Sequence, residues 1–177
     1  MKMNKTGFTL VELLAAMVIL AILMGVAIPN IVGTITRQRN NVYVEDAKRL
    51  VVRARTTFSA DTSINKENGV CFTLEFLDNG DFDEPPNGGI YLRKLSYVRY
   101  NTTATGDEYT VTLVECVNCD KTEGNITGDT ARSKDLRGIA SKTYTALKNA
   151  DNPNNIVAAS SSISTSEPGC KYTDPNA

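Results

Sequence analysis

The feature that most constrains this chain is an apolar run from Phe8 to Ile28 that carries one charged residue, Glu12. A helix of this length, at about 1.5 Å per residue, matches the ~30 Å hydrocarbon core of a bilayer. A carboxylate inside such a helix is costly, so its presence indicates a function. After Glu12 no charged residue follows until Arg37. The function is therefore sought first at this carboxylate and at the peptide bond that precedes Phe8.

The residues that precede the apolar run predict its orientation. Residues 1–7 contain Lys2 and Lys5 and no acid, so we expect the N-terminus to stay in the cytoplasm and the rest of the chain to lie outside. An ordinary secretory signal would be cut at small residues after the apolar core, and residues 27–30 fit such a site poorly. A plain single-pass anchor would explain the run but not the Gly7–Phe8 junction or Glu12.

Composition argues against two classes of function. The chain contains no histidine, which removes the commonest general base and any mixed Cys/His metal site. No constellation of catalytic residues is evident, so we do not expect an enzyme. The formal net charge is −1, which gives no electrostatic indication of nucleic-acid binding.

The segment Gly7–Leu14, with the sequence GFTLVELL, stands at the start of the apolar run, and Pro29 stands at its end. This arrangement resembles the type III signal of type IV prepilins and pseudopilins. The resemblance implies that a prepilin peptidase cuts between Gly7 and Phe8 and that the new amine of Phe8 is N-methylated. It also matches Glu12 to the glutamate of the family and Pro29 to its helix-kinking proline. It covers the N-terminal end of the chain alone.

Physical chemistry gives the cleavage a purpose. Cutting after Gly7 creates an ammonium group at Phe8, and a carboxylate in a low-dielectric helix bundle needs a positive partner. The new N-terminus of a neighbouring subunit can supply that partner to Glu12. The alternative is that Glu12 merely reaches the membrane interface, although its short side chain suits it poorly to this role.

Three residues in the first half of the helix have low helix propensity. Gly25, Pro29 and Gly33 recur at four-residue spacing. Each weakens a helix, glycine by about 1 kcal/mol and proline by removing a hydrogen bond and clashing with the previous turn. One interpretation is ordinary close packing of small residues in a membrane span. The other, which the family resemblance favours, is that residues 25–33 bend and partly melt on assembly.

The predicted fold is α+β and pilin-like. A long bent N-terminal helix, with a membrane half and an amphipathic half, packs on a small antiparallel β-sheet, and a further short helix follows. The predicted parts are a cleaved leader (1–7), a transmembrane and assembly half of the helix (8–28), an amphipathic half (29–60) and an exported head (61–177). The apolar residues at three- and four-residue steps in the amphipathic half are Val44, Ala47, Leu50, Val51, Ala54 and Phe58.

Within the head, the pattern of apolar and turn residues predicts the other elements. Residues 70–77 fit either a strand or a helical turn. The remaining expectations are strands over 90–100 and 109–117 joined by a hairpin loop at 102–107, a loop at 120–129, a second amphipathic helix over 130–150 and an edge strand at 156–159.

Four cysteines, Cys71, Cys116, Cys119 and Cys170, lie in the head. In an exported chain they favour two disulfides, but a structural zinc site with all four as ligands and partly free thiols remain alternatives. No other cofactor is expected. The C-terminal loop of many pilins is closed by a disulfide, and by that resemblance we expect Cys170 to pair with Cys116 or Cys119.

These observations predict a structural subunit of a type IV pilus that polymerises through its N-terminal helix and serves surface adhesion or motility. The alternative is a minor pilin, or a pseudopilin of a type II secretion or DNA-uptake machine. Expected partners are further copies and other pilins in a helical filament, the prepilin peptidase and a membrane assembly platform. The precursor is expected in the bacterial cytoplasmic membrane and the mature subunit in the extracellular fibre.

Overall fold

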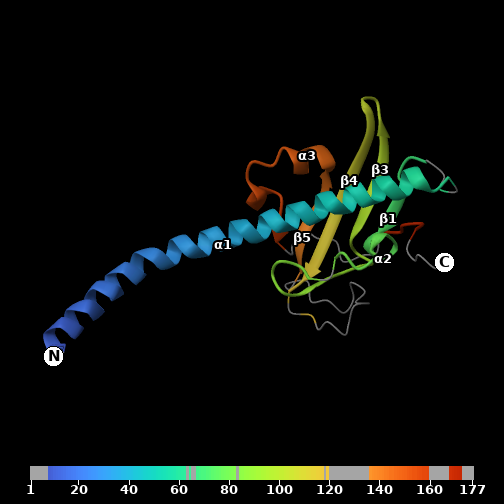
Figure 1. Cartoon of the computed structure of the whole chain (residues 1–177). Coiled ribbons are helices and arrows are strands. Elements are labelled where there is room, and N and C mark those ends of the chain that lie inside the picture. Colours follow the sequence, from blue (N-terminus) through green and yellow to red (C-terminus); the bar gives the residue numbers. More distant parts are fainter. Residues whose placement is uncertain are drawn as a thin grey trace, which may run out of the picture. The chain divides into compact units, whose positions relative to one another are not determined.

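The computed structural model describes residues 8–62, 64, 67–82, 84–117, 119, 136–159 and 168–172, and Figure 1 shows its elements. The chain divides into two compact units, Met1–Gln38 and Arg39–Ala177, which are described separately below. The helices are α1 (Leu10–Ala60), α2 (Leu74–Leu77), α3 (Tyr144–Lys148) and the 3-10 helix η3 (Pro153–Asn155). The strands are β1 (Cys71–Thr73), β2 (Ile90–Tyr91), β3 (Tyr97–Thr103), β4 (Gly106–Cys116), β5 (Leu136–Thr143) and β6 (Ala158–Ala159).

The strands of the second unit form one antiparallel sheet. Its order is β1-β3-β4-β5-β6. β2 pairs with the C-terminal end of β4, on the edge of β4 that also pairs with β3. β3 and β4 form a hairpin in which Thr103 lies opposite Gly106, so the turn is shorter than the predicted loop. The α+β class, with a long N-terminal helix on a small antiparallel sheet and further short helices, is confirmed.

The main hydrophobic core lies between the sheet and the part of α1 that belongs to the second unit. The predicted apolar stripe of this helix is buried, as is Tyr43. Against it pack Val98, Val111, Leu113 and Ile139 from three strands. The Tyr43 hydroxyl donates to the carbonyl oxygens of Leu113 (3.1 Å) and Arg137 (3.2 Å). This hydroxyl therefore joins α1 to β4 and β5 without leaving a buried polar group unsatisfied.

A second, smaller core lies on the other face of the sheet. Successive side chains of a strand point to opposite faces, and Val114 and Cys116 alternate with Leu113 and Glu115 along β4. The small core contains Ile90, Leu92, Leu95, Val114, Cys116 and Leu136. This end of the sheet is thus buried on both faces.

That double burial explains why the predicted helix over residues 130–150 is wrong for residues 136–143, which form β5, while residues 130–135 lie outside the described residues. Leu136 and Ile139, three residues apart as on a helix face, instead point to opposite faces of β5 and enter the two different cores. Gly138 between them lies so close to β4 that a Cβ atom would stand 2.0 Å from the carbonyl oxygen of Leu113. Among the described residues of this range, the helix is confined to α3, whose N-cap Thr143 accepts from the Ala146 amide.

Two other predicted elements differ in detail. The strand expected over residues 90–100 is divided into β2 and β3, because the chain turns where the amides of Leu95 and Ser96 donate to the carbonyl of Leu92. The ambiguous segment 70–77 contains both alternatives, a three-residue strand followed by a helical turn that Thr73 caps. The edge strand near residues 156–159 is confirmed as β6, while the predicted loop 120–129 lies outside the described residues.

One acid is fully buried at the doubly covered end of the sheet. Glu115 of β4 accepts a hydrogen bond from the side-chain amide of Asn87, and its Oε2 has no hydrogen-bond partner among the described residues. Among the described residues, the titratable groups that influence this region electrostatically are Arg39, Tyr43 and Asp46 of α1, Tyr91 of β2 and Arg137 of β5. Burial raises the pKa of Glu115 to about 7, against the opposing effects of Asn87, Arg137 and Arg39.

The raised pKa predicts a pH-dependent stability of the head. The folded chain holds the proton on Glu115 more tightly than the unfolded chain, whose value is near 4.5, so the stabilisation is complete below that pH and is lost as the pH rises through 7. The free energy of unfolding should therefore fall by about 3 kcal/mol between the low and the high end of this pH range. In Glu115→Gln, which keeps an acceptor for Asn87, chemical unfolding between pH 5 and 8 should show a correspondingly flatter profile. Glu108→Gln on the same strand is the control, and an unchanged slope in Glu115→Gln would contradict the prediction.

Candidate functional site: the N-terminal helix and the disulfides

The first unit presents an apolar surface with no cover of its own. Between Phe8 and Gln38, every side chain that the structure describes is exposed. Long apolar residues from Phe8 to Ile35 make up most of this surface. Among the described helices, α1 alone is long and apolar enough, by length and composition, to cross a membrane. Such a surface is stable only in lipid or against other apolar surfaces.

The N-terminus of α1 is closed by a capping box formed by Thr9 and Glu12. The backbone amide and the hydroxyl of Thr9 both donate to Oε2 of Glu12, each at 2.9 Å. In return the Glu12 amide donates to the Thr9 hydroxyl oxygen at 3.3 Å. This reciprocal arrangement satisfies backbone donors that a helix end leaves free. The carboxylate is thereby held at the positive end of the helix dipole, next to Phe8.

The capping role of Glu12 was not among the expectations from the sequence, although the sequence carries its signal. A Thr-x-x-Glu pattern before an apolar run is the ordinary mark of a capping box, and Thr9-Leu10-Val11-Glu12 fits it. A cap of this kind contributes about 1 kcal/mol to helix stability. Glu12 therefore has a local structural role in addition to the assembly role that the resemblance implies.

The structure describes all but one of the other residues predicted for the N-terminal site. Phe8 is highly exposed, whereas Gly7 and the rest of the leader lie outside the described residues. Gly25, Pro29 and Gly33 all lie within the continuous helix α1. A Cβ atom at Gly25 or Gly33 would meet nothing within 4 Å, so both positions offer open backbone surface for another helix. Melting on assembly stays a prediction.

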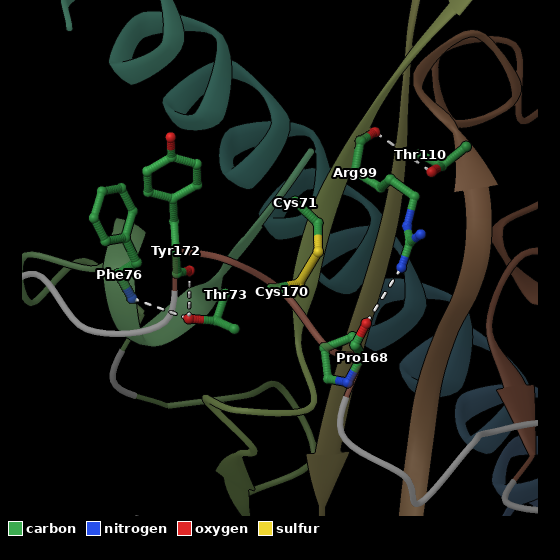
Figure 2. The surroundings of a disulfide bond; sticks show 8 residues. All are labelled: Cys71, Thr73, Phe76, Arg99, Thr110, Pro168, Cys170 and Tyr172. Atoms are coloured by element: carbon green, nitrogen blue, oxygen red, sulfur yellow. Dashed lines mark hydrogen bonds between the residues drawn. A yellow bond between two sulfur atoms is a disulfide. The ribbon is translucent and has the colours of Figure 1, made fainter. Parts of the chain in front are cut away.

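The cysteines of the second unit form two disulfides, Cys71–Cys170 and Cys116–Cys119. The expected pairing of Cys170 with Cys116 or Cys119 is wrong. Cys170 lies instead against the edge strand β1, where Figure 2 shows the bridge to Cys71. The zinc alternative would require the thiolates of both bridges.

Hydrogen bonds and a ring contact with β1 and β3 hold the segment 168–172 on both sides of Cys170. The amide of Thr73 donates to the carbonyl oxygen of Tyr172 at 3.0 Å, and Phe72 pairs with Tyr172 as a parallel bridge. The guanidinium of Arg99 donates to the carbonyl oxygen of Pro168 at 3.4 Å (Figure 2). The ring of Tyr172 stacks on Phe72, with centroids 5.1 Å apart. The segment therefore covers the free edge of β1, which would otherwise invite pairing with another strand.

The second disulfide closes a short loop at the end of β4. Cys116 is buried in the small core, and Cys119 packs partly against it. Gly89 lies directly over this point, because a Cβ atom there would stand 1.9 Å from the carbonyl oxygen of Cys116. Only a residue without a side chain allows the loop before β2 to approach β4 this closely.

Comparison with known families identifies the N-terminal segment. Residues 2–28 match the model of the prokaryotic N-terminal methylation motif. The chain thus carries the signal sequence of type IV prepilin-like precursors, which are structural proteins of the pilin type and not enzymes. No curated protein and no solved structure matches the chain significantly.

The two disulfides should differ in their contribution to stability. Cys71 and Cys170 are 99 residues apart, whereas Cys116 and Cys119 are 3 apart. In the chain-entropy model the longer loop is worth about 4.7 kcal/mol and the shorter about 2 kcal/mol. The double variant Cys71→Ser/Cys170→Ser should therefore lower the unfolding midpoint by more than Cys116→Ser/Cys119→Ser, as measured by chemical denaturation of the full chain in detergent. Peptide mapping without reduction checks the pairing, and a zinc adduct in the native mass, or the reverse order of stabilities, would contradict it.

Proposed function

We propose that this chain is a structural subunit of a type IV pilus. The proposal has the prepilin peptidase cut after Gly7, the amine of Phe8 become N-methylated, and the mature chain polymerise through α1. The observation that carries it is the methylation motif at residues 2–28, joined to a helix whose apolar surface is exposed throughout the first unit. Adhesion or motility on surfaces is the role that we assign to the fibre.

The exposed apolar surface of α1 supports the proposal that this helix packs against other helices in a fibre. A membrane can cover this surface in the precursor, and the same face can pass from lipid to neighbouring helices without ever meeting water. Because lipid tails are as apolar as the side chains, close packing and polar contacts must provide the preference for the fibre. The open backbone at Gly25 and Gly33 permits close packing, and Glu12 provides the polar contact.

The capping box lowers the energetic cost of the Glu12 carboxylate in the membrane before assembly. In the single chain, Thr9 and the helix dipole partly offset the carboxylate, which would otherwise be unpaired at the membrane. Cleavage leaves Thr9 as the second residue of the mature chain, so the box survives it. A neighbour's ammonium at Phe8 then offers Glu12 a full positive charge in a low-dielectric environment. Processing thus creates the partner that favours addition of a subunit.

The head fits a part that works outside the cell. Its disulfide Cys71–Cys170 holds the C-terminal segment to the sheet edge, and disulfides persist in oxidising compartments. A minor pilin or a pseudopilin of a secretion or DNA-uptake machine would share the same N-terminal chemistry. The abundance of the chain in sheared fibres separates these roles from that of a major subunit.

A pair of substitutions tests whether Glu12 acts in assembly through its charge or only through the cap. Glu12→Gln keeps an oxygen that can accept from Thr9 but removes the charge, so we expect fibre yield to fall at least tenfold while membrane insertion and cleavage continue. Thr9→Val keeps the charge and removes the hydroxyl of the box, at a cost of about 1 kcal/mol per helix. We expect Thr9→Val to retain most of the fibre yield. Yield is measured by quantifying the chain in sheared fibres against the mature chain in membranes.

The fibre yields of these two variants can contradict the proposed role of the Glu12 charge. Normal fibre yield from Glu12→Gln as the sole copy would show that the charge is not needed. A loss of fibre yield in Thr9→Val with a normal yield in Glu12→Gln would show that Glu12 acts through the cap. Thr36→Val is the matched control, since the Thr36 hydroxyl donates only to the carbonyl oxygen of Val32 on the same helix.

A further inference from the structure

A small polar pocket of about 190 Å³ lies in the second unit, and none of the disulfide cysteines lines it. Three elements of the second unit form it. α1 contributes Arg55, the hairpin of β3 and β4 contributes its turn with Asp107 and Glu108, and the start of α3 contributes Tyr144 and Thr145. The pocket brings one cation, two acids and several hydroxyl groups to a single place.

Arg55 is held in position by two aromatic rings. Its guanidinium lies between two aromatic rings, 4.8 Å from the centroid of Tyr109 and 4.3 Å from that of Tyr144. Its Nε is buried and has no hydrogen-bond partner among the described residues. An unsatisfied donor on a buried charged group destabilises a folded protein. The two tyrosines thus hold rigidly a group whose polar requirement is unmet.

The opposite wall supplies acceptors. Oδ1 of Asp107 accepts from the Tyr100 hydroxyl at 2.7 Å, which orients that carboxylate. No described hydrogen bond engages its second oxygen or the carboxylate of Glu108, which also lines the pocket. The Thr103 hydroxyl donates to the carbonyl oxygen of Gly106 at 2.7 Å and so stiffens the turn. The pocket therefore has donors on the α1 side and acceptors on the hairpin side.

This distribution selects a ligand class. An anion would suit Arg55 but meet two carboxylates, and a cation would suit the carboxylates but meet Arg55. A neutral ring with adjacent hydroxyl groups satisfies both walls, because each hydroxyl can accept from the guanidinium and donate to a carboxylate. The volume is below the roughly 300 Å³ of a drug-sized site, which restricts the ligand to a single small ring.

We propose that the pocket formed by Arg55, Asp107 and Glu108 binds one sugar ring. Arg55 donates to ring hydroxyls, and the two carboxylates accept from neighbouring hydroxyls of the same sugar. The head would then carry a carbohydrate-binding site at the β3–β4 hairpin. This inference concerns the second unit alone and does not depend on how the chain assembles.

The test is saturation-transfer NMR on the full chain in a polyoxyethylene ether detergent, which has no sugar headgroup. Glucose, galactose, mannose and N-acetylglucosamine are the probes, each titrated to obtain a dissociation constant. We expect saturable binding of at least one sugar. Arg55→Lys and Glu108→Ala should each weaken it at least tenfold, because they remove the fork of donors and one acceptor.

Arg53→Lys is the matched control, since Arg53 lies on the same helix but does not line this pocket. It should leave sugar binding unchanged, and circular dichroism should show that every variant keeps its fold. Absence of binding for all four sugars would overturn the proposal, as would unchanged binding in Arg55→Lys. Displacement of the sugar by acetate or sulfate at equal concentration would mark an anion site and would also overturn it.

Discussion

The apolar surface of the first half of α1 is the constraint on which the behaviour of this chain depends. Between Phe8 and Ile35 the long apolar side chains are exposed, and the second unit has buried cores of its own. The apolar surface of the first unit therefore needs a cover that its own helix does not provide. Lipid can provide one cover, and in the proposed fibre further copies of the same helix provide another. Glu12 is the single charged side chain on this surface between Phe8 and Ile35. In the proposed fibre it gains a positive partner, the Phe8 ammonium of a neighbour, that lipid tails do not offer.

The chain separates assembly from whatever its head does. The N-terminal site is short in sequence and local in structure, for the capping box joins residues only three apart. The head instead depends on contacts between distant segments, such as Tyr43 with β4 and β5, and Cys71 with Cys170. The head surface can therefore change without altering the N-terminal site. The Arg55 pocket lies on this head surface.

The sequence predicted what depends on local pattern and missed what depends on the sheet. The helix, its buried stripe and the β3–β4 hairpin followed from periodicity and turn residues, and the motif at residues 2–28 confirmed the resemblance. β5 was mistaken for a helix because Leu136 and Ile139 enter cores on opposite faces. The partner of Cys170 depends on which strand forms the sheet edge, which spacing does not reveal. Arg55 gave no signal, since its pocket joins three elements.

The central claim is that cutting the Gly7–Phe8 bond creates the group that pairs with Glu12 in the fibre. The most direct measurement is the intact mass and N-terminal sequence of the chain isolated from its native membrane and from sheared fibres. The account predicts a mature chain that begins at Phe8, carries one methyl group on its amine and keeps two disulfides. A fibre-derived chain that still carries the leader, or one cut beyond the apolar run near Pro29, would contradict it.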